Sequence, residues 1–349
     1  WNLPTASLES VFKCQHKYWS RKLQREVISD YVPNFSLVDP FSPDPLSQVE
    51  QKYTYWLKPI KSAGSYLAFQ IHNRREFYQG LTLIQENIRR LSIPFNYVLS
   101  CNNLPPEIEK IDFNYCLTEQ QIGGRQCTLE GYVYRGKFQV YGIIDSVRFP
   151  HLSSFSRYEY PSKLPKRVTD KMKDIARRFL EYIEFDNSTF NVEFFWNESQ
   201  DKIWVIEFNT RMSQSHSYLF TMVDGVSNHQ AMVKVGLGED PHFPHREGPY
   251  RYAAKFFYRK FEDALVSKVP SNEEILEIQR KVQGSLIHVN VHEGMMLSDL
   301  LEQDSYSYDV AWIFVAGNTR DELQRRYQQC LQLLNFQFQT QSLDSICSH

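Results

Sequence analysis

Two apolar runs that each carry acidic residues constrain this chain most. They are STFNVEFFWN at 188–197 and KIWVIEFNTR at 202–211, and the four polar residues ESQD separate them. Aromatic and β-branched residues favour strands, and a short polar connection favours a turn, so the two runs are predicted to pair as a hairpin. Alternate side chains of a strand share a face, so Glu207, Asn209 and Arg211 point the same way, and the hairpin can bring Glu193 beside them. The sequence therefore predicts that two carboxylates and an amide converge on one face of a sheet.

The chemistry of such a cluster suits a hard divalent cation. Mg²⁺ prefers oxygen ligands and commonly sits between carboxylates and substrate phosphates, so Glu193, Glu207 and Asn209 are candidate metal ligands. An arginine in the position of Arg211 can hold a phosphoryl group during its transfer. The alternative interpretation is a polar outer strand face with a solvated salt bridge.

A second candidate feature is the loop KPIKSAGS at 58–65, which lies between β-rich runs at 53–60 and 66–73. A short Gly/Ser loop exposes backbone N–H groups to phosphate oxygens, and a lysine at the end of the preceding strand supplies positive charge. The spacing is not that of GxxxxGK[ST], so a plain hairpin loop is the alternative interpretation.

Composition excludes several classes of protein. The chain has 349 residues and a formal net charge of -2, which gives no overall attraction to nucleic acid or anionic lipid. Its longest apolar stretches, such as 310–317, are shorter than the ~18–20 residues of a membrane span. Six scattered cysteines without a CxxC pair indicate neither a zinc site nor a disulfide framework, so reduced thiols and a cytoplasmic location are expected.

The order of predicted elements is mixed. A helix is expected at 17–28, followed by a proline-rich connector, two strands, and a helix through 76–91. Strands at 114–121, 126–135 and 137–149 are expected to form a mostly antiparallel meander, with a tight turn at 135–137. After a helix at 164–183 and the hairpin, a β-rich C-terminal part follows, with helices near 271–281 and 320–334. We expect boundaries that give four segments, at 1–50, 51–110, 111–245 and 246–349.

From Lys17 to about Pro241 the chain resembles ATP-grasp carboxylate ligases, most strongly in the EFNTR motif with a glutamate on the preceding strand. The resemblance implies an α+β fold in which two α+β subdomains grip ATP, here 51–110 as the smaller lid and 111–245 as the nucleotide- and metal-binding part. It also implies a small C-terminal β-rich subdomain. Relatives carry a further domain before the first lysine, so an N-terminally truncated or processed chain is expected.

The resemblance also implies a role for each matching residue. Lys17 and Lys58 match two lysines on the ATP phosphates, and Ser62, Ala63, Gly64 and Ser65 match the loop that folds over them. Glu119 matches the acidic residue at the hinge of the nucleotide site, called the hinge acid below. The backbone of Gln120 and Ile122, which follow it, matches the part that binds the adenine edge. Gln126 stands where many relatives carry an acid for the ribose. The remaining matches are Glu193, Glu207 and Asn209 for Mg²⁺, Arg211 for the acyl-phosphate, and Arg157 as a further phosphate contact.

The implied activity is an ATP- and Mg²⁺-dependent ligase that joins a small carboxylate or amino acid to an amine through an acyl-phosphate. Two Mg²⁺ ions are expected, with Mn²⁺ as a substitute, and the partners are small molecules, with a homodimer as an option and no nucleic acid or membrane. A non-catalytic ATP-binding protein is one alternative. Biotin carboxylation is another, but Ser215 stands before His216 where that branch has a glutamate base. A substrate contact for His216, and solvated His242 and His245, complete the expectations.

Overall fold

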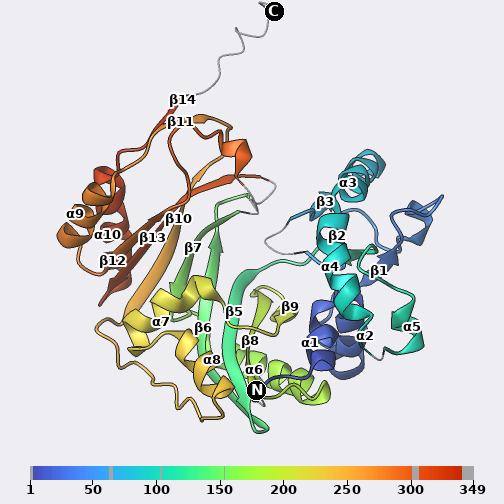
Figure 1. The fold of residues 1–349 in the computed structure, drawn as a ribbon. Helices are drawn as coiled ribbons and strands as arrows, with labels where there is room; N and C mark the ends of the chain where they lie inside the picture. Colours follow the sequence, from blue (N-terminus) through green and yellow to red (C-terminus); the bar gives the residue numbers. More distant parts are fainter. Residues whose placement is uncertain (1–2, 63–65, 103, 153, 301–305, 340–349) are drawn as a thin grey trace, which may run out of the picture. The chain divides into compact units, whose positions relative to one another are not determined.

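The computed structural model describes residues 3–62, 66–102, 104–152, 154–300 and 306–339 (Figure 1). The chain divides into two compact units. The first comprises 1–143, 163–213 and 229–242, and the second comprises 144–162, 214–228 and 243–349. The four predicted segments do not coincide with these two units, and their boundaries stay a prediction.

The first unit contains a four-stranded antiparallel sheet in the order β1-β4-β2-β3. Its strands are β1 (Phe35–Val38), β2 (Tyr55–Pro59), β3 (Phe69–Ile71) and β4 (Cys116–Gln120). Helix α3 (Arg74–Asn87) packs against β2 and β3, and it is followed by α4 (Arg89–Leu99) and the short α5 (Pro106–Glu109) (Figure 1). Apolar side chains such as Tyr55, Leu57 and Phe77 form the core between sheet and helices.

One strand assignment made from the sequence is wrong. The strand at 114–121 was expected to join the meander of 126–135 and 137–149, but β4 pairs with β1 and β2 instead. The physical reason is that both flanks of β4 are covered: β2 takes one edge from Tyr55 to Pro59, and β1 takes the other from Phe35 to Val38. Hydrophobic alternation identifies a strand but not its partners, so the sequence did not reveal this pairing.

The other sheet of the first unit has the strand order β6-β5-β8-β9. The strands are β5 (Arg125–Tyr134), β6 (Lys137–Arg148), β8 (Ser188–Asn197) and β9 (Lys202–Asn209), and β6 continues into the second unit. The turn between β5 and β6 has positive φ angles of 49° at Arg135 and 73° at Gly136, as the predicted tight hairpin turn requires. The predicted hairpin of 188–197 and 202–211 is confirmed by antiparallel pairing of β8 with β9.

Three helices pack around this sheet. They are α1 (Leu8–Gln15), α2 (Lys17–Ile28) and α6 (Lys166–Tyr182), and a fourth helix of the unit is α8 (Asn228–Gly236). The apolar face of α6, with Met172 and Phe179, packs against Val192 and Phe194 of β8. Because side chains alternate along a strand, Asn191 and Glu193 lie on the face of the sheet that α6 does not cover.

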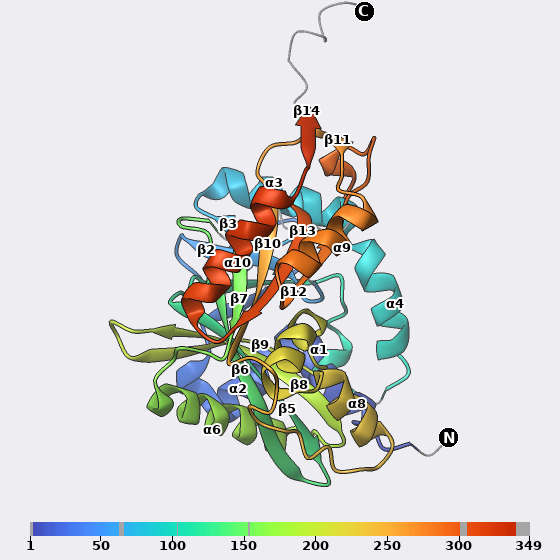
Figure 2. The ribbon, with the colours of Figure 1, turned by 90° about the vertical axis from the view of Figure 1, so that its left-hand side faces the viewer.

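The second unit contains a sheet in the order β12-β13-β10-β7, followed by the end of β6 (Figure 2). The strands are β7 (Phe155–Tyr160), β10 (Tyr252–Lys260), β12 (Ser285–Val289) and β13 (Tyr308–Gly317). Helices α9 (Asn272–Lys281) and α10 (Arg320–Leu333) pack on the sheet face that carries Ala254 and Phe256. Helix α7 (Ser217–Asp224) also packs on this sheet, and β11 (Leu265–Lys268) pairs with β14 (Gln337–Gln339). The predicted β-rich C-terminal part is thus confirmed.

Within the residues that the structure describes, none of the helices has both the length and the apolar composition needed to cross a membrane.

Candidate functional site

The acidic hairpin brings its two glutamates together through a β-bulge. Glu193 of β8 lies directly opposite Glu207 of β9, whereas the next pair is Phe194 with Val205, so Ile206 is an extra residue on β9. Val205 is part of the core against α6, and regular alternation would put Glu207 on that same apolar face. The bulge reverses the alternation, so Glu207 faces the same side as Glu193. Two residues further along each strand, Asn209 of β9 pairs with Asn191 of β8, so Asn209 lies on this face too.

Helix α2 presents Lys17 to this cluster. His16 caps the helix: its Nδ1 accepts a hydrogen bond from the Trp19 N–H at 3.2 Å, and its Nε2 donates to the Ile111 carbonyl at 2.8 Å. Burial lowers the pKa of His16, in keeping with a neutral ring that accepts at one nitrogen and donates at the other. Lys17 is the first helical residue, and its Nζ lies 2.7 Å from Oε1 of Glu207 and 3.1 Å from the Ser62 carbonyl.

The predicted second lysine and the predicted hinge acid contact each other. Lys58 of β2 donates to Oε2 of Glu119 on β4, and both side chains lie on the same face of the four-stranded sheet. The predicted phosphate lysines therefore each pair with a carboxylate, Lys17 with Glu207 and Lys58 with Glu119.

Arg21 is a functional candidate that sequence reasoning missed. Its guanidinium is buried and makes three hydrogen bonds of 2.6 Å, to Oε1 of Glu119, Oε1 of Gln24 and the carbonyl of Ile206. The Ile206 carbonyl belongs to the bulge residue, so Arg21 ties the bulge to the hinge acid. Burial alone would raise the pKa of Glu119, but Arg21 and Lys58 lower it to about 2. The spacing of Arg21 one helical turn after Lys17 is the only sequence signal for it.

Lys61 is a second residue that was missed. Burial, together with the charges of Lys17 and Arg211, lowers its pKa to about 8, although Glu207 acts in the opposite direction. Its Nζ donates to Oε1 of Gln15 and lies 4.6 Å from the centre of the Phe95 ring. Lys17 is in contact with Glu207, and the charges of Lys58 and Lys61 also act on it. For Glu207 too, burial would raise the pKa, and the charges of Lys17, Lys58 and Lys61 lower it.

The residues predicted for the adenine and ribose have specific contacts. The N–H of Gln120 donates to the Asn34 carbonyl at 2.8 Å, so within the described chain only its carbonyl is left for an adenine edge. Ile122 is half-buried in the connection between β4 and β5. Gln126 donates from Nε2 to Oε2 of Glu193 at 3.1 Å, so it lies beside the acidic cluster. Gly64 and Ser65 lie outside the described residues, as does Ala63, while Ser62 precedes them directly.

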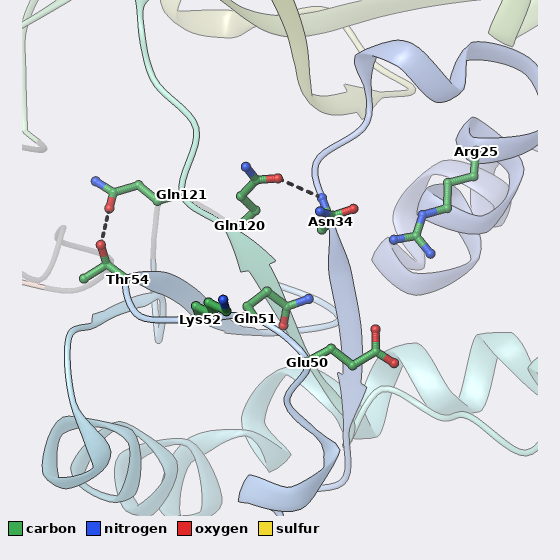
Figure 3. A pocket seen from close by; sticks show the side chains of 8 residues that line it. All are labelled: Arg25, Asn34, Glu50, Gln51, Lys52, Thr54, Gln120 and Gln121. Carbon is green, nitrogen blue, oxygen red and sulfur yellow. Dashed lines mark hydrogen bonds between the residues drawn. The ribbon is translucent and has the colours of Figure 1, made fainter.

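A separate cavity of about 700 Å³ lies beside the end of β4 (Figure 3). The side chains of Gln120 and Gln121 reach it, and they hydrogen-bond to the Asn34 N–H at 3.4 Å and the Thr54 hydroxyl at 2.6 Å. Its lining is polar and of both charges. The other lining residues are Arg25, Glu50, Gln51 and Lys52. Of the predicted site residues that the structure describes, Gln120 alone borders this cavity.

All but one of the candidates described next lie in the second unit. Ser215 accepts a hydrogen bond of 3.2 Å from Lys255, and the buried His216 ring packs edge-on against Tyr158 at 4.9 Å. Arg157 donates to Glu159 at 2.6 Å. His242, at the end of the first unit, and His245 are exposed, as expected for solvated side chains.

The part of the chain that carries most of these residues matches a known protein family. A profile of the ATP-grasp domain matches residues 51–217, which include Lys58, Glu119, Glu193, Glu207, Asn209 and Arg211. The chain contains an ATP-grasp domain. No curated protein matches its sequence.

Solved structures share the fold over nearly the whole chain. An L-amino acid ligase from Bacillus licheniformis is similar with a TM-score of 0.71 and 14% identity, over 97% of this chain and 76% of that protein. A carboxyaminoimidazole ribonucleotide synthase from Aspergillus clavatus, complexed with ATP, gives 0.65 and 15%, over 94% and 74%. A biotin carboxylase from Campylobacter jejuni gives 0.64 and 13%, over 96% and 70%. The predicted α+β ATP-grasp fold is confirmed.

Proposed function

We propose that this ATP-grasp protein is an ATP- and Mg²⁺-dependent ligase that joins a small carboxylate, such as an amino acid, to an amine. The observation that carries the proposal is the in-register pair of Glu193 and Glu207, with Asn209 on the same face and Lys17 bound to Glu207. The sequence motif predicts a metal and phosphate role for these same residues. The similarity of the fold to an L-amino acid ligase supports the reaction class.

The donor set of this cluster fits Mg²⁺. It offers two carboxylates and one amide, all oxygen donors, and the described chain contains no group of three or more His, Cys, Asp or Glu side chains placed to bind a metal ion. Mg²⁺ usually takes one or two carboxylates and completes its shell with water and substrate phosphates, so a partial protein set is suitable. Glu193, Glu207 and Asn209 would hold the ion. When bound, it would neutralise charge on the phosphates of ATP.

In the proposed reaction, a carboxylate oxygen of the substrate attacks the γ-phosphorus of ATP. A C–O–P bond forms, the bond from the γ-phosphorus to its bridging oxygen breaks, and ADP leaves. The amine nitrogen then attacks the acyl carbon, the C–O bond to phosphate breaks, and inorganic phosphate leaves as the amine loses a proton. The products are an amide, ADP and phosphate.

The chain's own part in this reaction is positioning and charge compensation. Lys17 and Lys58 would exchange their present carboxylate partners for phosphate oxygens when nucleotide enters. Glu207 is then freed for the metal, while Glu119 keeps Arg21 as its partner. Arg211, two residues beyond Asn209, would offset the charge of the transferring phosphoryl group.

A thermal-shift titration tests nucleotide binding. Saturable stabilisation by Mg²⁺-ATP and Mg²⁺-ADP is expected, because a ligand that binds only the folded state raises the melting temperature. Absence of stabilisation by either nucleotide would contradict the proposal.

A non-catalytic ATP-binding protein is a second candidate, favoured by Gln126, which places an amide where many relatives carry a carboxylate. Stabilisation by nucleotide without substrate-dependent ADP formation would select it. Carboxylation is disfavoured because Ser215, bound to Lys255, offers no carboxylate to act as base. Bicarbonate-dependent, biotin-stimulated turnover would instead show carboxylation.

A further inference from the structure

We infer that Asn191 is a positioning residue for the proposed metal site, because it fixes which atom of the Asn209 amide faces the metal. This inference rests on the proposed function. Asn191 lies on β8, two residues before Glu193, and forms a cross-strand pair with Asn209 of β9. Both side chains are at least nine-tenths buried, with 3% of Asn191 and 8% of Asn209 exposed.

The hydrogen bonds of Asn191 leave no freedom in its orientation. Its Nδ2 donates to the backbone carbonyl of Arg211 at 2.8 Å. A carbonyl oxygen only accepts, so the amide nitrogen of Asn191 must point to it, and the Oδ1 must point the other way. This holds even though the oxygen and nitrogen of an amide are otherwise easily exchanged by a flip.

The orientation is passed on to Asn209. The Oδ1 of Asn191 only accepts, and the Nδ2 of Asn209 donates to it at 3.0 Å. The Oδ1 of Asn209 therefore points away from Asn191. Among the described residues this oxygen accepts no hydrogen bond, so it is an oxygen donor available on the face that carries Glu193 and Glu207.

Glu130, Asn191 and Asn209 form a row of cross-strand neighbours on β5, β8 and β9, and this row anchors the segment that follows β9. Glu130 of β5 is the register partner of Asn191 on its other side, and its Oε2 accepts from the Ser213 N–H at 3.2 Å. Asn191 holds the carbonyl of Arg211 and Glu130 holds the amide of Ser213. Two buried side chains from adjacent strands thus fix the backbone on either side of Met212, and with it the origin of the Arg211 side chain.

Groups that orient metal ligands without touching the metal typically contribute 10–100-fold to metal affinity. Without Asn191, nothing in this row selects the orientation in which Asn209 offers oxygen. The amide can then turn its NH₂ group to the metal, which repels a cation. Glu193, Glu207 and the contacts of Lys17 with nucleotide would be unaffected.

The test is the Mg²⁺ dependence of ATP binding by Asn191→Leu, which is nearly isosteric and removes both hydrogen bonds. We expect the Mg²⁺ concentration for half-maximal enhancement of ATP binding to rise about 10–100-fold. Because Glu130 still holds the Ser213 amide in the variant, the segment that carries Arg211 stays anchored, and ATP affinity in EDTA should stay as in the wild type. The melting temperature of the nucleotide-free protein should also stay within a few degrees. Thr189→Val, a buried polar-to-apolar change two residues earlier on the same face of β8, is the matched control and should leave both affinities unchanged.

The outcomes separate this inference from the proposed function. If wild-type protein binds ATP without any Mg²⁺ dependence, the proposed metal site is wrong. If the wild type depends on Mg²⁺ and Asn191→Leu has the same dependence, the positioning role is wrong while the metal site stands. A loss of ATP affinity in EDTA equal to the loss in Mg²⁺ would show a structural role only. If Asn191→Leu does not fold, Asn191→Ser carries the same test, because serine cannot span to both partners.

Discussion

The ammonium of Lys17 lies 2.7 Å from the carboxylate of Glu207, although the two residues are 190 positions apart in the sequence and come from a helix start and a bulged strand. One residue is a proposed phosphate ligand and the other a proposed metal ligand. Their contact places the proposed phosphate site beside the proposed metal site within the first unit. It also neutralises both charges until nucleotide arrives.

Changing Glu207 to glutamine should nearly abolish ADP formation while the protein stays folded. The change removes one proposed metal ligand and the partner of Lys17 but keeps the size of the side chain. A loss of about 10²–10³-fold in turnover is expected, as for removal of one group that stabilises transition-state charge. A coupled assay of ADP measures it. Glu198→Gln, at an exposed turn of the same hairpin, should retain wild-type turnover; an active Glu207→Gln protein would overturn the metal assignment.

Changing Arg21 to methionine should destabilise the protein. Glu119 would remain buried with Lys58 as its one charged partner, and the Ile206 carbonyl of the bulge would lose its donor. Removing one member of a buried ion pair costs about 3–5 kcal/mol. Urea unfolding measures this cost. As a control, Arg177→Met, which removes two exposed helix ion pairs, with Asp174 and Glu181, should change stability by less than about 1 kcal/mol.

Acid should weaken the stabilisation that Glu119 supplies. The folded-state pKa of Glu119 is about 2, below its ordinary value of 4.5, because Arg21 and Lys58 outweigh burial. A lowered carboxylate pKa stabilises the fold fully above pH 4.5, and the stabilisation disappears as the pH falls toward 2. The difference in unfolding free energy between wild type and Glu119→Gln should therefore be largest near neutral pH and shrink in this window. A constant difference across the window would contradict the assignment.

Lys255 should make the fold less stable as the pH falls from about 10.5 to 7. Burial lowers its pKa from 10.5 to about 7, and Arg259 acts in the same direction, although Asp309 opposes them. In this window the unfolded chain binds more protons than the folded protein, so stability rises with pH. Lys255→Met should remove this part of the slope, as urea unfolding at several pH values would show. Contacts with Trp312 at 3.7 Å compensate part of the cost of burying the charge. An unchanged slope in the variant would show that Lys255 is not the group that titrates.

Much of the fold was predictable because local patterns specify it. The amphipathic run at 17–28 and the apolar runs at 188–197 and 202–211 form the expected helix and hairpin, since each carries the period of its own element. The partners of β4 were not predictable. A strand with two covered edges pairs with whichever strands the tertiary fold brings to it, and β1 and β2 lie far from it in the sequence.

Part of the site was likewise predictable from the sequence, and part was not. The motif with Glu193, Glu207 and Asn209 was recognisable because acids interrupt an apolar strand. The bulge at Ile206, which makes the arrangement work, left no signal beyond the consecutive apolar residues before Glu207. Arg21 and Asn191 were missed as functional residues because their roles depend on contacts with a distant backbone carbonyl or with a residue on a neighbouring strand. Such contacts exist only in the folded chain.

The most direct measurement is phosphate release from Mg²⁺-ATP in the presence of amino acids and small carboxylates, each with and without an added amine. We predict that at least one carboxylate raises release severalfold above the ATP-only rate, and that Glu207→Gln loses this response. A protein that binds Mg²⁺-ATP but shows no carboxylate-dependent release across the series would contradict the proposed ligase activity.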